Sequence, residues 1–254
     1  MVRKIIQLIK NRRIFCVSLL FNIVLSIMLV YVVCIKTDLY DRLLSKVGVG
    51  TYSVAESRHH IEFRCIEGWA NTLYKMNLEA NAVFYGNSIT FENNFQEDYP
   101  QLLLCNMGCN RDDLDDMINR AFMIGSVRPK KIFILGGING FINVHLGDFK
   151  RKYEMLVDTI KAQNPHSQLF LQSMLPVNVN LEIGSRYAGK QEKIKEANEI
   201  IRDISLNKKC TYVDLYSAYQ IHDSLPKEYT RDGLHLYPEA YSIWSRIISS
   251  YLND

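Results

Sequence analysis

The chain has 254 residues, of which 48% are hydrophobic and 22% are charged. These fractions are close to those of globular proteins, so the composition excludes a largely disordered chain. The formal net charge of +3, from 30 basic and 27 acidic residues, is too small to indicate nucleic-acid binding. The six cysteines include no Cys-x-x-Cys pair or zinc-ligand cluster, so we expect no metal and no cofactor.

An apolar segment near the N-terminus predicts a membrane anchor. Residues 14–35 are almost entirely apolar, and about 20 such residues span a bilayer as a helix. Five basic residues precede the segment, whereas the charges that follow it nearly balance. Because positive charges favour the cytoplasmic side, residues 1–13 are predicted to be cytoplasmic. The rest of the chain is predicted to lie outside the cytoplasm, which makes it a single-pass protein of the cell membrane.

A signal peptide, a lipid anchor or a core helix would fit this segment less well. A cleaved signal peptide or a lipid-modified Cys34 would need a small residue just before the processing site, where the chain has Val33. A buried core helix would be shorter and less uniformly apolar.

Residues 36–80 are predicted to connect the anchor to a folded domain and to include an amphipathic helix. Apolar residues recur there at helical spacing, at Ile61, Cys65, Trp69, Leu73 and Met76. Disulfides are permitted outside the cytoplasm, but the pairing of Cys65, Cys105, Cys109 and Cys210 stays open. Cys105 and Cys109 could pair with each other or remain buried thiols.

Five short apolar runs follow, each bounded by polar or turn residues. This pattern is typical of strands that are buried on both faces of a parallel sheet. The runs are Ala82–Tyr85, Leu102–Asn106, Lys131–Leu135, Gln168–Ser173 and Thr211–Leu215.

Helical patterns alternate with these runs. They extend from about Asp112 to before Pro129, and over Phe149–Ala162, Gln191–Leu206 and Pro238–Leu252. The alternation predicts an α/β domain over residues 81–254, a three-layer α/β/α sandwich with a five-stranded, mostly parallel sheet. Sites in such sheets form beyond the carboxyl ends of the strands.

Two segments carry the residues of serine-hydrolase chemistry. Tyr85-Gly86-Asn87-Ser88-Ile89-Thr90 places a serine on a turn after a strand, and Asp232-Gly233-Leu234-His235 offers an acid and an imidazole. A serine hydroxyl attacks efficiently only when a base removes its proton and a third group orients that base. The two segments together predict a serine esterase.

Four segments, in order, resemble the blocks of the SGNH hydrolase (GDSL esterase/lipase) superfamily. They are Gly86-Asn87-Ser88, Asn106-Met107-Gly108, Gly137-Ile138-Asn139-Gly140 and Asp232-Gly233-Leu234-His235. The resemblance covers roughly residues 81–252 and implies a flavodoxin-like SGNH fold, here in a membrane-anchored member with an N-terminal transmembrane helix.

The resemblance also implies a role for each block. Ser88 would be the nucleophile, His235 the general base and acid, and Asp232 the residue that orients His235. The backbone N–H groups of Ser88 and Gly108 and the side-chain amide of Asn139 would form the oxyanion hole.

Three further residues are candidates for the substrate pocket. Asn87 stands where the family more often has aspartate, Arg111 stands where a second glycine is common, and His145 closely follows the third block. The acids at positions 112, 113, 115 and 116 look like a metal cluster but are better explained as acids in the first turn of a helix.

The predicted reaction is hydrolysis of an oxygen ester through an acyl-enzyme intermediate, with an acetylated carbohydrate or glycan as the first-choice substrate. Anchored, extracytoplasmic members of the superfamily often act on glycans, and no long apolar lid is evident near the motifs. A lipid ester such as a lysophospholipid is the alternative, because the anchor would hold the domain near a bilayer. The same triad could also serve an O-acyltransferase, if a sugar hydroxyl replaced water.

Overall fold

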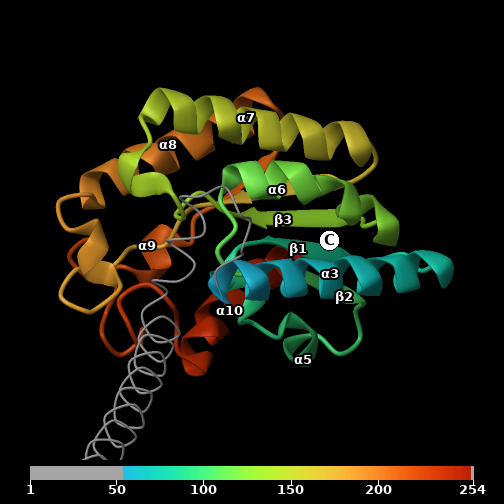
Figure 1. The fold of residues 1–254 in the computed structure, drawn as a ribbon, viewed down its shortest axis with the longest axis horizontal. Coiled ribbons are helices and arrows are strands. Elements are labelled where there is room, and N and C mark those ends of the chain that lie inside the picture. The colour runs from blue at the N-terminus through green and yellow to red at the C-terminus, as the bar shows by residue number, and fades with distance from the viewer. Residues whose placement is uncertain (1–53, 253–254) are drawn as a thin grey trace, which may run out of the picture. The chain divides into compact units, whose positions relative to one another are not determined.

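The computed structural model describes residues 54–252 of the chain (Figure 1). The predicted cytoplasmic segment 1–13, the predicted anchor 14–35 and most of the connecting segment lie outside the described residues. None of the helices within residues 54–252 is long and apolar enough to span a membrane. The chain divides after His60 into two units, and the unit that begins at Ile61 contains the sheet.

Five parallel strands form one sheet in the order β2-β1-β3-β4-β5. The strands are β1 (Ala82–Gly86), β2 (Leu104–Gly108), β3 (Lys131–Leu135), β4 (Gln168–Gln172) and β5 (Thr211–Val213). Every residue of β1 and β3 is buried, as expected for central strands covered on both faces. The prediction of a five-stranded parallel sheet within an α/β domain is confirmed.

Strand β2 begins and ends two residues later than predicted. Leu102 belongs instead to a turn, in which its N–H donates to the carbonyl oxygen of Tyr99. The N–H of Leu103 donates to the Asn81 side chain and not to a strand. Two apolar residues of a preceding turn therefore look like strand in the sequence.

The strand order reverses at β1, which pairs with β2 on one side and with β3 on the other. Gly86, at the end of β1, is level with Gly108 of β2 and Leu135 of β3. In open parallel sheets a crevice forms beyond the carboxyl ends of the strands at such a reversal. The loops that follow β1, β2 and β3 therefore leave the sheet side by side.

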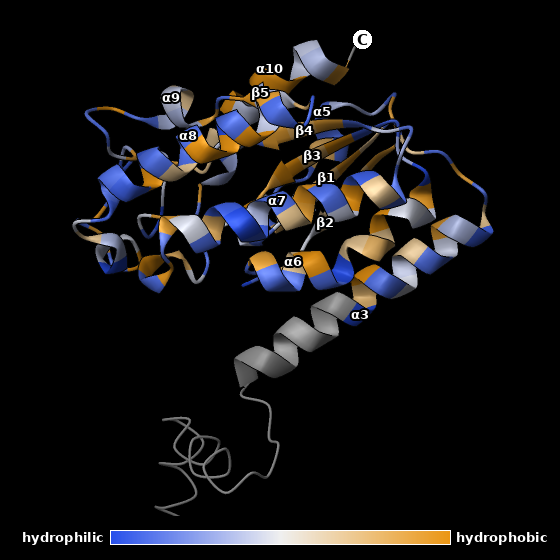
Figure 2. Cartoon of the chain, turned by 90° about the horizontal axis from the view of Figure 1, so that it is seen from above, coloured by the Kyte–Doolittle hydropathy of each residue, from blue (hydrophilic) through white to orange (hydrophobic). Residues whose placement is uncertain are grey.

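Helices cover both faces of the sheet (Figures 1 and 2). One face carries α6 (Leu114–Arg120), α7 (Leu146–Gln163) and α8 (Gln191–Asn207), and the other carries α5 (Phe95–Asp98) and α10 (Tyr241–Leu252). Two short helices, α4 (Ser88–Phe91) and α9 (Tyr216–Tyr219), lie in the connections.

Two predicted helices are interrupted. The segment between Asp112 and Pro129 forms α6 and then the 3-10 segment η1 (Ala121–Val127), which is followed by Arg128 at a left-handed φ of 41°. The last helix is preceded by a 3-10 turn, η4 (Pro238–Ala240), with a proline in its first turn. Short 3-10 turns, η2 (Phe141–Asn143) and η3 (Gly184–Tyr187), occur in two other loops.

A row of aromatic rings fills the core between the sheet and α10. Phe84 of β1 stacks on Phe95 and Phe133, and Phe133 stacks on Phe170 of β4. Trp244 of α10 is fully buried and meets the edge of Phe95. Because ring pairs of this kind add to the free energy gained by burial, they hold the three central strands firmly under α10.

Helix α3 (Val54–Lys75) precedes the sheet, as predicted, but it does not bury the predicted face. Trp69 and Met76 are exposed, whereas Ala70 and Leu73 are buried and Ile66 packs against the core. The buried positions follow the i, i+4, i+7 spacing of one helix face, which is offset from the predicted one by one residue at Trp69. Among the described cysteines, Cys65, Cys105 and Cys210 are free thiols, so Cys105 does not pair with Cys109.

Candidate active site

Ser88 is the first residue of α4, and only Asn87 separates it from the end of β1, so the chain turns sharply there. Asn87 caps this helix: its side-chain oxygen accepts a hydrogen bond from the N–H of Ile89, at 3.1 Å. A Cβ atom on Gly86 would lie 2.2 Å from Thr90 Oγ1 and 2.4 Å from the carbonyl oxygen of Leu135. Only glycine therefore lets the strand turn this closely into the helix.

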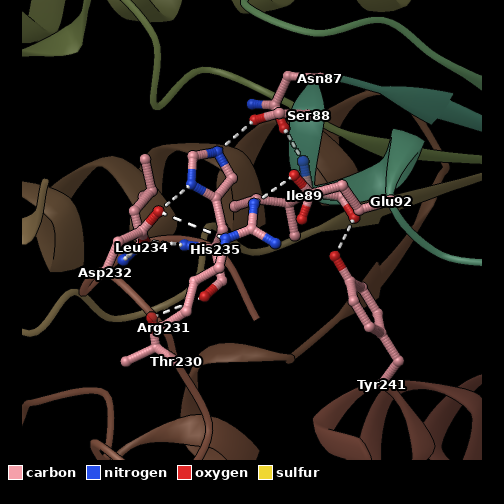
Figure 3. Close-up of polar contacts among 10 residues, drawn as sticks. All are labelled: Asn87, Ser88, Ile89, Glu92, Thr230, Arg231, Asp232, Leu234, His235 and Tyr241. Atoms are coloured by element: carbon pink, nitrogen blue, oxygen red, sulfur yellow. Dashed lines mark hydrogen bonds and ion pairs between the residues drawn. The ribbon is translucent and has the colours of Figure 1, made fainter. Parts of the chain in front are cut away.

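Ser88, His235 and Asp232 form a continuous line of hydrogen bonds (Figure 3). Ser88 Oγ is 3.0 Å from His235 Nε2, and His235 Nδ1 is 2.7 Å from Asp232 Oδ2. Both distances lie within hydrogen-bond range. The structure thus brings together three residues that the sequence separates by up to 147 positions.

Asp232 and His235 are oriented within one turn. Asp232 Oδ1 accepts the N–H groups of Leu234 and His235, at 3.0 and 2.8 Å, while its other oxygen contacts the imidazole. Burial raises the pKa of the Asp232 carboxyl, but the hydrogen bonds from His235 and Leu234 outweigh it, so the pKa lies below its ordinary value. Asp232 is therefore held as a carboxylate that accepts from the Nδ1 side of the ring.

The turn is held in place by neighbouring backbone. Gly233 has a left-handed φ of 92°, and a Cβ atom on it would lie 2.4 Å from the carbonyl oxygen of Asn178. The carbonyl oxygen of Asp232 accepts from the N–H groups of Ile183 and Gly184. Thr230 Oγ1 closes the loop by donating to the carbonyl oxygen of His235 at 2.7 Å.

Two further contacts join this loop and the last helix to α4. Arg231 forms an ion pair with Glu92 at 2.6 Å, and the Tyr241 hydroxyl of α10 donates to the carbonyl oxygen of Ile89 at 2.8 Å (Figure 3). These contacts help to set the distance between Ser88 and His235.

Asn139 lies on the loop after β3, and its side chain is fixed by the loop after β2. Its Nδ2 atom donates to the carbonyl oxygen of Asp112 at 2.9 Å. An amide nitrogen carries two hydrogens, so this contact leaves a second donor. The N–H of Ser88, in the first turn of α4, has no acceptor among the described residues.

Gly108 does not supply the free donor that was predicted. Its N–H donates to the side-chain oxygen of Asn106 at 2.8 Å. Glycine is required there for another reason, because a Cβ atom would lie 2.2 Å from the N atom and 2.6 Å from the Cα atom of Phe91. Gly108 thus permits the close approach of β2 to α4.

Arg111, three residues further on, has a left-handed φ of 70°. Its side chain is exposed, and no described residue accepts a hydrogen bond from its N–H. The left-handed region costs a non-glycine residue roughly 1–2 kcal/mol, and residues strained in this way concentrate at functional sites.

The two other pocket candidates, Asn87 and His145, have different environments in the structure. Asn87 is only 1% exposed and caps α4, so its side chain serves the nucleophile turn and not a pocket surface. His145 is exposed at the start of α7, and its place in a pocket stays a prediction. A cavity of about 30 Å³ beside Asn139 is lined by residues of the same loop, by Asp113 and Leu114 at the start of α6 and by Phe149 and Lys152 of α7.

The acidic cluster has two functions. Asp113 and Asp116 form a capping box at the start of α6, as expected for first-turn acids. Asp112 instead pairs with Arg120 in the interior, where both side chains are 1% exposed. The sequence offered no signal for this buried pair, because an acid and a base eight residues apart normally lie in solvent.

Solved structures share this fold. A protein from Streptococcus pneumonia, described as "a putative platelet activating factor", is 24% identical with a TM-score of 0.69, covering 78% of this chain and 96% of its own. A GDSL-like lipase from Bacteroides thetaiotaomicron is 18% identical with a TM-score of 0.57, covering 84% and 97%. A catalytic mutant of an acetylxylan esterase from Geobacillus stearothermophilus is 16% identical with a TM-score of 0.54, covering 69% and 94%. No curated protein matches the chain.

A family model covers the segments that build the site. The GDSL-like Lipase/Acylhydrolase family matches residues 84–243, which run from the second half of β1 to the start of α10. This range holds all four of the predicted blocks. The chain therefore belongs to the GDSL-like lipase/acylhydrolase family and is a carboxylic ester hydrolase.

Proposed function

We propose that the protein is a serine esterase that removes small acyl groups, above all acetyl, from a carbohydrate through an acyl-enzyme intermediate. The observation that carries the proposal is the hydrogen-bonded line from Ser88 Oγ through His235 to Asp232. It provides a nucleophile, a base on the nucleophile and a carboxylate on the base, which is the arrangement that serine hydrolases use.

In the first step Ser88 Oγ attacks the ester carbonyl carbon as His235 Nε2 takes the hydroxyl proton. A bond forms between Oγ and carbon, and the carbonyl electron pair moves onto oxygen. When this pair returns, the bond from carbon to the alcohol oxygen breaks, and His235 gives its proton to the departing alcohol. Water, activated by His235, then repeats the sequence on the acyl-serine and releases the acid. Asp232 holds the ring in the required tautomer throughout.

The oxyanion requires N–H donors at its developing negative charge. The N–H of Ser88 and the second hydrogen of Asn139 Nδ2 are two such donors, because neither has an acceptor among the described residues. Since the Gly108 N–H is occupied by Asn106, we assign the third position to the N–H of Arg111. Its left-handed backbone is the conformation that a glycine would adopt there without strain.

Two observations support a small acyl group on a sugar. We assign the acyl group to the cavity beside Asn139, which at about 30 Å³ has room for about two water molecules and suits a methyl group better than a long chain. Two aromatic residues close in sequence to the line of hydrogen bonds have exposed side chains, Phe91 three residues after Ser88 and Tyr237 two residues after His235. Such rings offer flat apolar faces to a pyranose ring. The acetylxylan esterase fold neighbour acts on a substrate of this class.

The test is turnover of nitrophenyl esters with acyl chains of two to about twelve carbons by the full chain, beside Ser88→Ala. We expect the highest kcat/KM on the acetyl ester, release of acetate from acetylated xylo-oligosaccharides, and a loss of about 10⁴-fold or more in Ser88→Ala. Equal activity of the two proteins on every ester and glycan would refute the serine mechanism. A preference for esters with long acyl chains or for lysophospholipids would refute the carbohydrate substrate. Transfer of the acyl group to an added sugar, in place of release of the acid, would show that the protein is an acyltransferase and not a hydrolase.

We also propose that residues 14–35 anchor this esterase in the cell membrane with the catalytic domain outside the cytoplasm. The length and apolar character of the segment and the basic residues before it support this topology. Protease added to intact cells, from which any layer outside the cell membrane has been removed, should digest the catalytic domain and leave a protected N-terminal fragment. Digestion only after lysis would overturn the proposed orientation.

A further inference from the structure

The buried guanidinium of Arg120 donates hydrogen bonds to three separate segments of the chain. Arg120, the last residue of α6, is 1% exposed, and its side chain is fully buried under the carboxyl ends of β1 and β2. Its Nε donates to Asp112 Oδ2, one terminal nitrogen donates to the carbonyl oxygen of Met107 at 2.9 Å, and the other donates to that of Gly86 at 2.8 Å. The group also lies 4.2 Å from the centre of the Tyr85 ring.

Each of these acceptors leads to a residue of the candidate site. Gly86 is the last residue of β1, two positions before Ser88, and Met107 directly precedes Gly108. Asp112 presents its carboxylate to Arg120 and its backbone carbonyl to Asn139 Nδ2, at 2.9 Å. One planar cation therefore fixes the ends of the two strands and the residue that orients the Asn139 amide.

We propose that Arg120 and Asp112 act as a positioning pair for the oxyanion hole, with Asn139 as the group through which they act. The inference rests on the proposed function, since it assigns Arg120 a task only if Asn139 stabilises an oxyanion. Arg120 itself touches no substrate. Its effect is to hold the Asp112 carbonyl so that the Asn139 amide aims its second hydrogen at the carbonyl oxygen of the ester that Ser88 attacks.

The chemistry of the guanidinium explains why arginine is needed. Its donors are spread in a rigid plane, so three acceptors on different segments are held in fixed relative positions. A lysine could neutralise Asp112, but a single ammonium on a flexible stem would not hold both strand ends in one geometry. Donors in an oxyanion hole contribute to rate only when they are held in place before the reaction, so such loosening should appear in kcat.

The test is a double-mutant cycle on the full chain with Arg120→Lys, Asn139→Ala and the two together. Asn139→Ala should lower kcat by about 10²–10³. Arg120→Lys should lower kcat by about 10–100-fold with KM of nitrophenyl acetate changed less than about threefold, because only the transition state uses the donor. If Arg120 acts through Asn139, the double variant should be nearly as active as Asn139→Ala.

A structural role alone predicts a different result. The double variant would then have a lower kcat than Asn139→Ala by the full factor that Arg120→Lys causes in the wild type. The proposal is overturned if the logarithm of the additional loss in kcat exceeds half the logarithm of that factor. The matched control is Lys131→Met, which removes a buried amine at the opposite end of the sheet, where Lys131 Nζ donates to the carbonyl oxygen of Tyr251 at 2.6 Å. It should lower the melting temperature and leave kcat within about twofold.

A replacement variant and a parallel assay make every outcome of the cycle interpretable. If Arg120→Lys does not fold, Asp112→Asn replaces it in the cycle, because it keeps the backbone carbonyl and loosens the same pair, and the same coupling is expected. Ser88→Ala is assayed in parallel: wild-type turnover there overturns the proposed function and this inference together. An inactive Ser88→Ala with an additive cycle overturns the inference alone.

Discussion

The two halves of the candidate site are held by different kinds of structure. Ser88 follows β1, an interior strand of the sheet, and its position is fixed by the β1 ladder, the aromatic core and the buried guanidinium of Arg120. The loop from Thr230 to Leu236 has no helix or strand and is closed by one antiparallel bridge between those two residues. The nucleophile half therefore depends on cooperative packing, whereas the acid–base half depends on a few individual hydrogen bonds. Substitutions in the two halves should therefore differ in how far they change stability and activity.

The largest effect is expected from Asp232→Asn. The amide can donate to the imidazole and would favour the wrong tautomer, so kcat should fall by about 10⁴ while the fold persists. Steady-state kinetics on nitrophenyl acetate and thermal unfolding would measure the two effects. A loss below tenfold would show that the acid–base half does not depend on this hydrogen bond.

Gly108→Ala should damage the nucleophile half through its packing. The added Cβ atom would collide with the backbone of Phe91, so β2 and α4 must separate. We expect a loss of about 1–3 kcal/mol in the free energy of unfolding and about 10² in kcat/KM, the size of effect that a displacement of about 1 Å can cause. Gly147→Ala, in α7 with no atom near the new Cβ, is the control and should be neutral or stabilising. If Gly108→Ala is destabilised but keeps its activity, the packing of β2 against α4 does not set the position of Ser88.

Gly233→Ala should uncouple activity from stability in the acid–base half. The substitution strains a φ of 92° and presses on the carbonyl oxygen of Asn178, so the turn carrying His235 must shift. A loss of about 10-fold to 10² in kcat/KM is expected, with a smaller loss of stability than in Gly108→Ala. Gly189→Ala has the same left-handed strain at φ 70° in open space and should retain full activity. Equal destabilisation by Gly108→Ala and Gly233→Ala would remove the contrast between the halves.

The acid–base half should also impose a pH dependence on stability. Because the pKa of Asp232 is lower in the folded chain, its ionised form stabilises the fold above the ordinary aspartate pKa of about 3.9, and this contribution is lost as the pH falls through the lowered value. The difference in unfolding free energy between wild type and Asp232→Asn should therefore be constant above about pH 5 and shrink as the pH falls from there through the lowered pKa. Urea unfolding at several pH values would measure it. A constant difference would mean that the carboxylate charge does not contribute.

The smallest effect is expected from Arg231→Met. Arg231 is half-exposed and its pair with Glu92 lies at the surface, where such pairs contribute about 0–1 kcal/mol. We expect kcat to change less than about fivefold, with a similarly small effect of Lys195→Met, a surface-pair control remote in sequence. A loss above tenfold in Arg231→Met alone would show that the ion pairs of Arg231, with Glu92 and with Asp232 at 3.7 Å, and not the turn itself, set the position of His235.

The features that the sequence predicted well are those written in local patterns. Buried parallel strands appear as unbroken apolar runs, and the tight Asp232–His235 turn is visible from spacing alone. The alignment of Ser88 with that turn followed from the order of the blocks and from the rule that strand ends converge on one edge.

The features that it missed depend on pairings that no local pattern records. The Gly108 N–H is occupied by a side chain two residues earlier, and nothing in Asn106-Met107-Gly108 distinguishes that from a free donor. Asp112 looked like a first-turn acid because its partner lies a full helix away at Arg120. The face of α3 was misplaced because Trp69, the largest apolar side chain of its stripe, is 39% exposed.

The distance along the chain between Ser88 and His235 has a consequence during synthesis. The two residues are 147 positions apart, and Tyr241, which bonds to Ile89, comes later still. At 5–20 residues per second, the ribosome would need roughly 7–30 s to make the base after the nucleophile. A nascent chain would therefore carry an unpartnered serine on a largely complete sheet, and ester turnover would begin only when the last helix had left the ribosome and docked.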